Sequence, residues 1–319
     1  MVLFSIGGLF WWIQNSKPVS SNEETVDFLV IRGRSASEIG HELYDKGLIK
    51  NALAFKFYVQ LTGKSDQIQA GEFRLSPSYS LKETVHALSG PPLELWVTIP
   101  EGLRREEIVM RFINGLEKKG SDAANFRNEF LEESEGLEGY LFPDTYLLPR
   151  DVRAASVVSV LKSNFDKKMN DIGHNFPAGY DLNDIVVLAS LIEREAITNR
   201  ERSVIAGILY NRLENEWPLQ VDAAVQYVKA NTYCKGKAEC DWWPKNLTKD
   251  DLEIDSSYNT YIYSGIPPAP ISNPGFESLK AAAEPTPNDY FFYIHADGEI
   301  YYAKTLQEHN SNIERYLSN

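Results

Sequence analysis

The segment Ile185–Ile197 reads IVVLASLIEREAI and guides the interpretation of the rest of the chain. Its first eight residues are apolar or small on every side, which predicts a helix buried in a protein core. Glu193, Arg194 and Glu195 then interrupt the apolar pattern. Residues two apart on a helix point about 200° apart, so Glu193 and Glu195 do not share one face. At least one of these two carboxylates is therefore expected to face protein.

The two glutamates differ in the side chains expected beside them. Leucine or isoleucine stands seven, four and three residues before Glu195, whereas the smaller Ala189 and Ser190 stand four and three residues before Glu193. Apolar burial disfavours the ionised carboxylate and raises its pKa, as a general acid requires near neutral pH. We predict that Glu195 is the catalytic acid and that Glu193 supports it. The simpler alternative is a solvated charged face near the end of the helix.

The composition restricts the class of protein. The 319 residues include 32 Lys and Arg against 45 Asp and Glu, which gives a net charge of −13 and the wrong sign for binding nucleic acid. Hydrophobic residues make up 43% of the chain, which excludes wholesale disorder. Cys234 and Cys240 have no histidine nearby, so we expect neither a metal site nor a cofactor. Their spacing suits a disulfide in an oxidising compartment, or two incidental thiols in a reducing one.

The first segment, Val2–Ile13, is an uncharged apolar run of 12 residues. As a helix it would cover only about 18 Å, which is too short for a hydrocarbon core of about 30 Å. Trp11 and Trp12 precede the polar stretch Gln14–Glu24, as interfacial aromatic residues do at the end of a membrane span. This pattern favours the outer end of a single-pass cell-membrane anchor, with the rest of the chain on the extracytoplasmic side. The alternative is a buried terminal helix.

The order of predicted elements indicates an α+β protein in four parts. Residues 1–24 form the partial anchor and linker, 25–92 a small α+β module, 93–152 a second small α+β unit, and 153–319 a mainly helical domain with a C-terminal β-hairpin. The patterns that support this division are three strands, two capping boxes, four helices and a hairpin turn: Asp27–Ile31, Gly71–Leu75 and Leu95–Ile99; Ser35 to Glu38 and Ser80 to Glu83; Phe55–Leu61, Ala154–Met169, Asn183–Ile197 and Arg202–Leu213; and Asp297-Gly298.

The motif LASLIEREA at residues 188–196 resembles the catalytic helix of the endolytic murein transglycosylase family, also called MltG or YceG-like. Further motifs stand in the family's order, and together they span about residues 27–310. They are LEGYLFPDTY (137–146), YNRL (210–213), LQVD (219–222), YNTY (258–261), GIPP (265–268), SNPG (272–275) and KAAA (280–283). Each motif is weak alone, but their ordered occurrence is highly specific.

The resemblance implies a membrane-anchored enzyme that cuts peptidoglycan strands internally between MurNAc and GlcNAc and so terminates nascent strands. It also implies that residues 25–92 are a LysM-like glycan-binding module, and that the enzyme works beside peptidoglycan synthases. In this family the 6-hydroxyl of the muramoyl residue attacks its own anomeric carbon and leaves a 1,6-anhydro end. One glutamate then serves both proton transfers. The family's catalytic glutamate maps onto Glu195, with Glu193 as the second choice.

Other residues of these motifs are candidates for binding the substrate. They are neutral or acidic hydrogen-bonding groups suited to N-acetyl and hydroxyl groups, namely Asn211, Gln220, Asp222, Tyr258, Asn259 and Tyr261. The alternative for these residues is a role in the fold and not in binding substrate. Asn259 suits a turn, and a structural hydrogen bond explains Asp222 equally well.

Two features depart from the family's pattern. Ala269 replaces the usual glycine after the Pro-Pro pair, and residues 231–246, with both cysteines and Trp242-Trp243, match no family segment. Two other functions stay open. One is a hydrolase with Glu195 as acid and Asp222 or Glu193 as base, and the other is a catalytically inactive glycan-binding scaffold.

Overall fold

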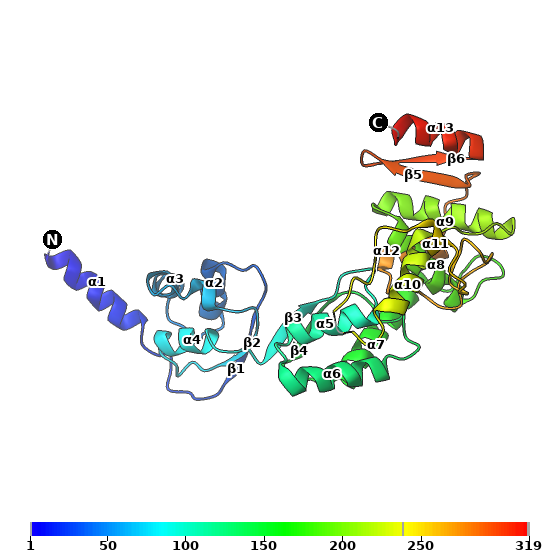
Figure 1. Cartoon of the computed structure of the whole chain (residues 1–319). Coiled ribbons are helices and arrows are strands. Elements are labelled where there is room, and N and C mark those ends of the chain that lie inside the picture. Colours follow the sequence, from blue (N-terminus) through cyan, green and yellow to red (C-terminus); the bar gives the residue numbers. More distant parts are fainter. Residues whose placement is uncertain (1, 238, 318–319) are drawn as a thin grey trace. The chain divides into compact units, whose positions relative to one another are not determined.

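The structure is a computed structural model that describes residues 2–237 and 239–317, with only the backbone of residues 2–6. It contains two compact units. The N-terminal unit comprises the residues up to Thr98 together with 114–118 and 145–152. The C-terminal unit comprises 99–113, 119–144 and the residues from Arg153 onward. Helices are combined with antiparallel strands, which confirms the predicted α+β class (Figure 1).

The N-terminal unit is built on a four-stranded antiparallel sheet with the strand order β1-β2-β3-β4. The strands are β1 (Val26–Val30), β2 (Gly71–Leu75), β3 (Glu94–Thr98) and β4 (Thr145–Pro149). Its helices are α1 (Val2–Asn15), α2 (Ala36–Asp45), α3 (Ala52–Leu61), α4 (Leu81–Leu88) and the short 3-10 helix η1 (Ser65–Gln67). The capping boxes predicted at Ser35 and Ser80 begin α2 and α4. Phe28 and Phe73 lie opposite each other in the sheet and are buried in this unit's core.

Helix α1 (Val2–Asn15) corrects the prediction of a membrane anchor. Its 14 residues extend about 21 Å, which is less than a hydrocarbon core of about 30 Å. Among residues 2–237 and 239–317, none of the helices combines the length and the apolar character that crossing a membrane requires. The predicted single-pass localisation is therefore contradicted. Trp12 instead stacks on Tyr58 of α3, with ring centroids 5.8 Å apart.

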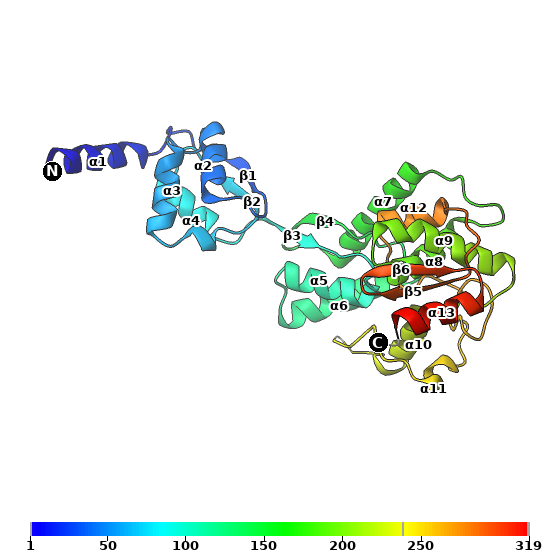
Figure 2. The ribbon, with the colours of Figure 1, turned by 90° about the horizontal axis from the view of Figure 1, so that it is seen from above.

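The C-terminal unit is mainly helical and ends in a β-hairpin, as predicted. Its elements are α5 (Arg105–Gly115, whose last two residues fall in the N-terminal unit), α6 (Gly120–Glu133), α7 (Ala154–Ile172), α8 (Leu182–Glu195), α9 (Asn199–Glu214), α10 (Asp222–Tyr233), α11 (Lys249–Leu252), α12 (Phe276–Ala283), β5 (Phe292–Ala296), β6 (Glu299–Ala303) and α13 (Leu306–Tyr316). Figures 1 and 2 show the hairpin between α13 and α9.

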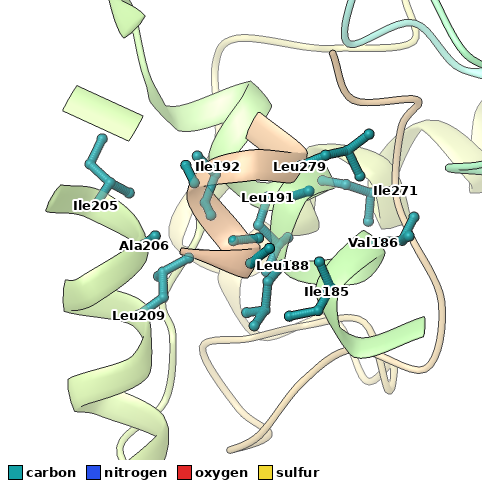
Figure 3. Packing of buried hydrophobic residues seen from close by; sticks show 14 of the residues in the cluster. Ile185, Val186, Leu188, Leu191, Ile192, Ile205, Ala206, Leu209, Ile271 and Leu279 are labelled. Carbon is teal, nitrogen blue, oxygen red and sulfur yellow. The ribbon is translucent and has the colours of Figure 1, made fainter. Parts of the chain in front are cut away.

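Helix α8 forms the centre of the core of the C-terminal unit. A capping box between Asp181 and Asp184 begins it, and every residue from Ile185 to Ile192 is buried. Figure 3 shows these apolar side chains packed against Leu279 of α12 and against residues of α9. The backbone turns to an extended conformation at Ala196. Glu195 is therefore the last helical residue, at the point where the buried helix reaches the edge of the core.

Asn273 of the SNPG motif holds loops together around this core. Its side-chain oxygen accepts hydrogen bonds from the backbone N–H groups of Gly139 and Leu141, each at 2.9 Å. Gly139 has φ 88°, and a Cβ atom there would come within 2.7 Å of a methyl group of Val186 on α8. The LEGY and SNPG motifs therefore have a structural role beside α8.

A disulfide joins Cys234 and Cys240, which resolves the question that their spacing left open. It follows the end of α10 and closes a short loop. Cys234 and Trp242 are buried together in a small apolar cluster. The disulfide thus links two positions of the segment 231–246 that matches no family motif.

Candidate active site

A cavity of about 360 Å³ opens at the end of α8. It is lined by residues from α8, α9, α10, α13 and β5, from the loop before α10 and from the loop between α11 and α12. These residues are Glu195, Arg212, Gln220, Asp222, Tyr261, Phe292, Tyr293, Ile294, Leu306 and His309. Four of the eight predicted site residues therefore line one cavity.

Glu195 has the environment of a general acid. Its Oε2 atom accepts a hydrogen bond of 2.6 Å from the hydroxyl of Tyr293 on β5. Burial raises the pKa of Glu195, and the Tyr293 hydrogen bond only partly opposes that shift. The nearby charge of Asp222 raises the pKa further. Glu195 thus holds its proton more strongly than an ordinary glutamate does, and it borders a polar cavity.

Asp222 faces the same cavity and is oriented by Tyr261. The Tyr261 hydroxyl donates a hydrogen bond of 2.6 Å to Oδ1 of Asp222, which is the first residue of α10. Gln220 has φ 51°, and its backbone N–H donates to the carbonyl of Thr260 at 2.9 Å. These contacts join the LQVD and YNTY motifs into one wall of the cavity.

Arg212 and Tyr293 are site residues that the sequence analysis missed. Arg212 donates from Nε to the carbonyl of Phe291 at 2.7 Å and from Nη1 to the carbonyl of Leu219 at 2.6 Å. It therefore ties the start of the hairpin to the loop that carries Gln220. Arg212 belongs to the YNRL motif, so the sequence did contain a signal that this arginine is a site residue. Tyr293 lies outside every motif that was recognised.

Glu193 has a different environment from Glu195. Its Oε1 atom accepts from Arg202 Nη2 at 3.1 Å, and the two side chains are 7% and 9% exposed. Its Oε2 atom accepts from the Gly275 backbone N–H at 3.0 Å and from the Ser278 hydroxyl at 2.8 Å. Both oxygens are thus used in joining α8 to α9 and α12. The cavity at Glu195 does not include Glu193 among its lining residues.

The other predicted binding residues lie elsewhere. Asn211 donates to the carbonyls of Asn288 and Tyr290, each at 2.9 Å, and so holds the segment that leads to β5. Asn259 is fully buried and donates to the carbonyls of Leu252, at the end of α11, and Ile254. Tyr258 lines a separate cavity. A role in binding substrate stays a prediction for these three residues.

The geometry is that of a general acid-base site with a single carboxylic acid of raised pKa. Within residues 2–237 and 239–317, we find no cluster of three or more His, Cys, Asp or Glu side chains placed to hold a metal ion. A sequence model of the YceG-like family matches residues 28–315. The chain therefore belongs to the YceG-like family, which confirms the resemblance seen in its motifs.

Individual relatives agree with this family. The chain is 32% identical to a Bacillus subtilis protein named endolytic murein transglycosylase, over 98% of this chain and 91% of that protein. It is 25% identical to a Streptococcus pneumoniae protein of the same name, over all of this chain but only 64% of the relative. The crystal structure of a YceG-like protein from Listeria monocytogenes has a TM-score of 0.58 and 28% identity, over 90% of this chain and 98% of that one.

Proposed function

We propose that this protein is an endolytic murein transglycosylase that cleaves the bond between MurNAc and GlcNAc within glycan strands and leaves 1,6-anhydro ends. One observation carries the proposal. The carboxyl of Glu195 has a raised pKa and borders a polar cavity, whereas Glu193 is engaged in an ion pair with Arg202. The names of the Bacillus and Streptococcus relatives support the same activity.

In the proposed mechanism Glu195 transfers a proton twice. The protonated carboxyl first donates to the glycosidic oxygen, and the bond between that oxygen and the anomeric carbon breaks. The carboxylate then takes the proton of the muramoyl 6-hydroxyl while its oxygen bonds to the anomeric carbon. Glu195 ends protonated again, and no water is consumed. This sequence requires one acid that is protonated at the start, which matches the burial of Glu195.

The neighbouring side chains have supporting roles in this proposal. Asp222 is an anion in the same cavity, suited to stabilise positive charge that develops on the sugar ring. Tyr261 fixes the Asp222 carboxylate, and Tyr293 fixes that of Glu195. Gln220 offers a neutral amide to an N-acetyl or hydroxyl group.

The pH dependence tests the protonation state. Because the reaction begins with protonated Glu195, we expect kcat to fall as the pH rises through the raised pKa of this group. The midpoint of the fall should lie above the ordinary value of 4.5 for glutamate. A pH profile of the cleavage of uncrosslinked glycan measures it. A rate that increases throughout this range would show that an ionised Glu195 begins the reaction instead.

Replacing Tyr293 by phenylalanine removes the hydrogen bond that lowers the pKa of Glu195. We expect kcat to fall about tenfold, since a charge-assisted hydrogen bond is lost, and the alkaline limb of the pH profile to move to higher pH. Tyr301→Phe on β6 is the matched control, because that ring stacks on Tyr316. A pH profile of Tyr293→Phe that coincides with the wild type would remove Tyr293 from the site.

A hydrolase is the second candidate, because Asp222 lies in the same cavity as Glu195 and could activate a water. Mass spectrometry of the products separates the two functions, since anhydro ends lack one water. The Asp222→Asn variant gives a second criterion. We expect it to lower the rate about a hundredfold while the products keep anhydro ends. Products with reducing ends from the wild-type protein would favour the hydrolase.

The finer parts of the proposal concern the cellular role. We propose that residues 25–92 act as a LysM-like glycan-binding module, that cleavage terminates nascent strands, and that peptidoglycan synthases are the functional partners. Synthases make the uncrosslinked strands that such a site would cut, which supports this partnership. Adding the protein to a strand-polymerising synthase should shorten the product strands.

A further inference from the structure

A second polar cavity, of about 370 Å³, lies within the C-terminal unit. Its lining residues all differ from those of the cavity at Glu195. They include two arginines, two glutamates, three tyrosines and two asparagines: Arg104, Arg105, Glu106, Glu138, Tyr140, Tyr227, Tyr258, Asn183 and Asn231. The proposed cleavage reaction uses none of these side chains.

Arg104 is the central group of this second cavity. Its side chain is 2% exposed, and its guanidinium lies between the rings of Tyr227 and Trp242, at 4.2 and 4.6 Å from their centroids. The Nη2 atom donates to Asn231 Oδ1 at 2.5 Å. Its Nε atom forms an ion pair with Oε2 of Glu106 at 3.4 Å, whereas its Nη1 atom is buried and finds no hydrogen-bond partner among the described residues. Stacking therefore fixes a guanidinium whose Nη1 donor is left without an acceptor.

The balance of charge in the second cavity favours an anion. Arg104 and Arg105 are both cationic, and Glu106 lies 3.4 Å from Arg104 and 3.6 Å from Arg105. Burial raises the pKa of Glu138 to about 8, so this carboxyl is mostly neutral at pH 7. Two positive charges thus face one negative charge. A carboxylate would compensate the remaining positive charge and accept from the unpaired Nη1 donor, whereas a neutral sugar hydroxyl would leave the charge uncompensated.

The position of the second cavity relative to Glu195 is set by α8. Asn183 near the start of α8 lines the second cavity, and Glu195 at its end lines the first. Twelve residues of helix separate them by about 18 Å. An extended peptide of about five residues covers up to about 18 Å. A peptide attached to a sugar near Glu195 is therefore long enough to reach Asn183 in the second cavity.

We propose that the second cavity binds a carboxylate of the peptide that a murein glycan strand carries, and so makes the enzyme prefer peptide-bearing strands. This inference rests on the proposed function, because it assigns part of the same substrate to a second site. Asn183, Asn231 and the Tyr258 hydroxyl supply neutral groups for the peptide's amides. Arg104 supplies the Nη1 donor and the positive charge for its carboxylate.

The test compares two forms of the same uncrosslinked glycan, one with its peptides and one from which an amidase has removed them. Two variants probe the cavity. Arg104→Gln removes the guanidinium, and Asn183→Asp adds a negative charge on an exposed residue and keeps the oxygen that accepts from Tyr140. We expect each variant to raise the KM for peptide-bearing strands about tenfold, with kcat unchanged and the KM for peptide-free strands unchanged.

The controls separate a binding effect from a folding defect. Asn170→Asp makes the same charge change at an exposed position of α7 and should leave both KM values unchanged. If Arg104→Gln lowers the melting temperature, Asn183→Asp decides the question. An Asn183→Asp variant with an unchanged KM for peptide-bearing strands would overturn the proposal, as would an equal rise for both strand types, which would indicate a sugar site. Cleavage that survives in Glu195→Gln would instead overturn the proposed function.

Discussion

Replacing Glu195 by glutamine is expected to lower the rate of glycan cleavage by about 10³-fold or more. Glutamine has nearly the same shape and still accepts the hydrogen bond from Tyr293, but it has no proton to donate to the glycosidic oxygen. Counting new chain ends after incubation with uncrosslinked glycan measures the effect. Retained cleavage would remove Glu195 from the mechanism.

Glycan binding provides the control for this variant. We expect Glu195→Gln to bind glycan strands as tightly as the wild type, because the change leaves the shape of the cavity and its other polar groups in place. A scaffold without catalytic activity would show the same binding but would give no cleavage even in the wild type. Parallel measurements of binding and cleavage therefore separate an enzyme from a scaffold.

Replacing Glu193 by glutamine should mainly affect stability. The change leaves the Arg202 guanidinium buried with its closest anion removed, and we expect the free energy of unfolding to fall by about 3 kcal/mol. Glu101, 3.7 Å from Arg202 and about half exposed, replaces that charge only in part. Denaturant unfolding of the full chain measures the loss.

Glu195→Gln is the matched control for stability, since the same chemical change is made two residues away on the same helix. Burial raises the pKa of Glu195, so ionisation of this group opposes folding. The Glu195→Gln variant should therefore be at least as stable as the wild type at neutral pH. If Glu193→Gln were the variant that unfolds normally but cannot cleave, the roles of the two glutamates would be reversed.

The contrast between Glu193 and Glu195 shows which features of the site the local sequence can predict. The helical period separates Glu193 from Glu195 and gives Glu195 the bulkier apolar neighbours, so the analysis of residues 185–197 could choose between them. The local sequence could not identify the residues that contact the two glutamates. Tyr293 lies 98 residues beyond Glu195, and its contact depends on how the hairpin packs against the helices. Arg202 contacts Glu193 only because the chain reverses between α8 and α9.

The fold was predictable where a local signal marks an element. Capping boxes marked the starts of α2 and α4, and Asp297-Gly298 marked the hairpin, where both residues adopt positive φ. Strand β4 was missed, since its short sequence TYLLP ends in proline and it forms by pairing with β3, about 50 residues earlier. The apolar start of the chain suggested a membrane anchor, but α1 is a helix of only 14 residues.

The hairpin has a consequence for how the candidate site is assembled. Phe292 and Tyr293 of β5 and His309 of α13 form part of the cavity at Glu195, although they lie far beyond α8 in the chain. A variant that lacks β5, β6 and α13 would keep Glu195 but lose the hydroxyl that orients it. The helix that carries the acid is therefore not sufficient for the site, and the hairpin supplies one of its walls.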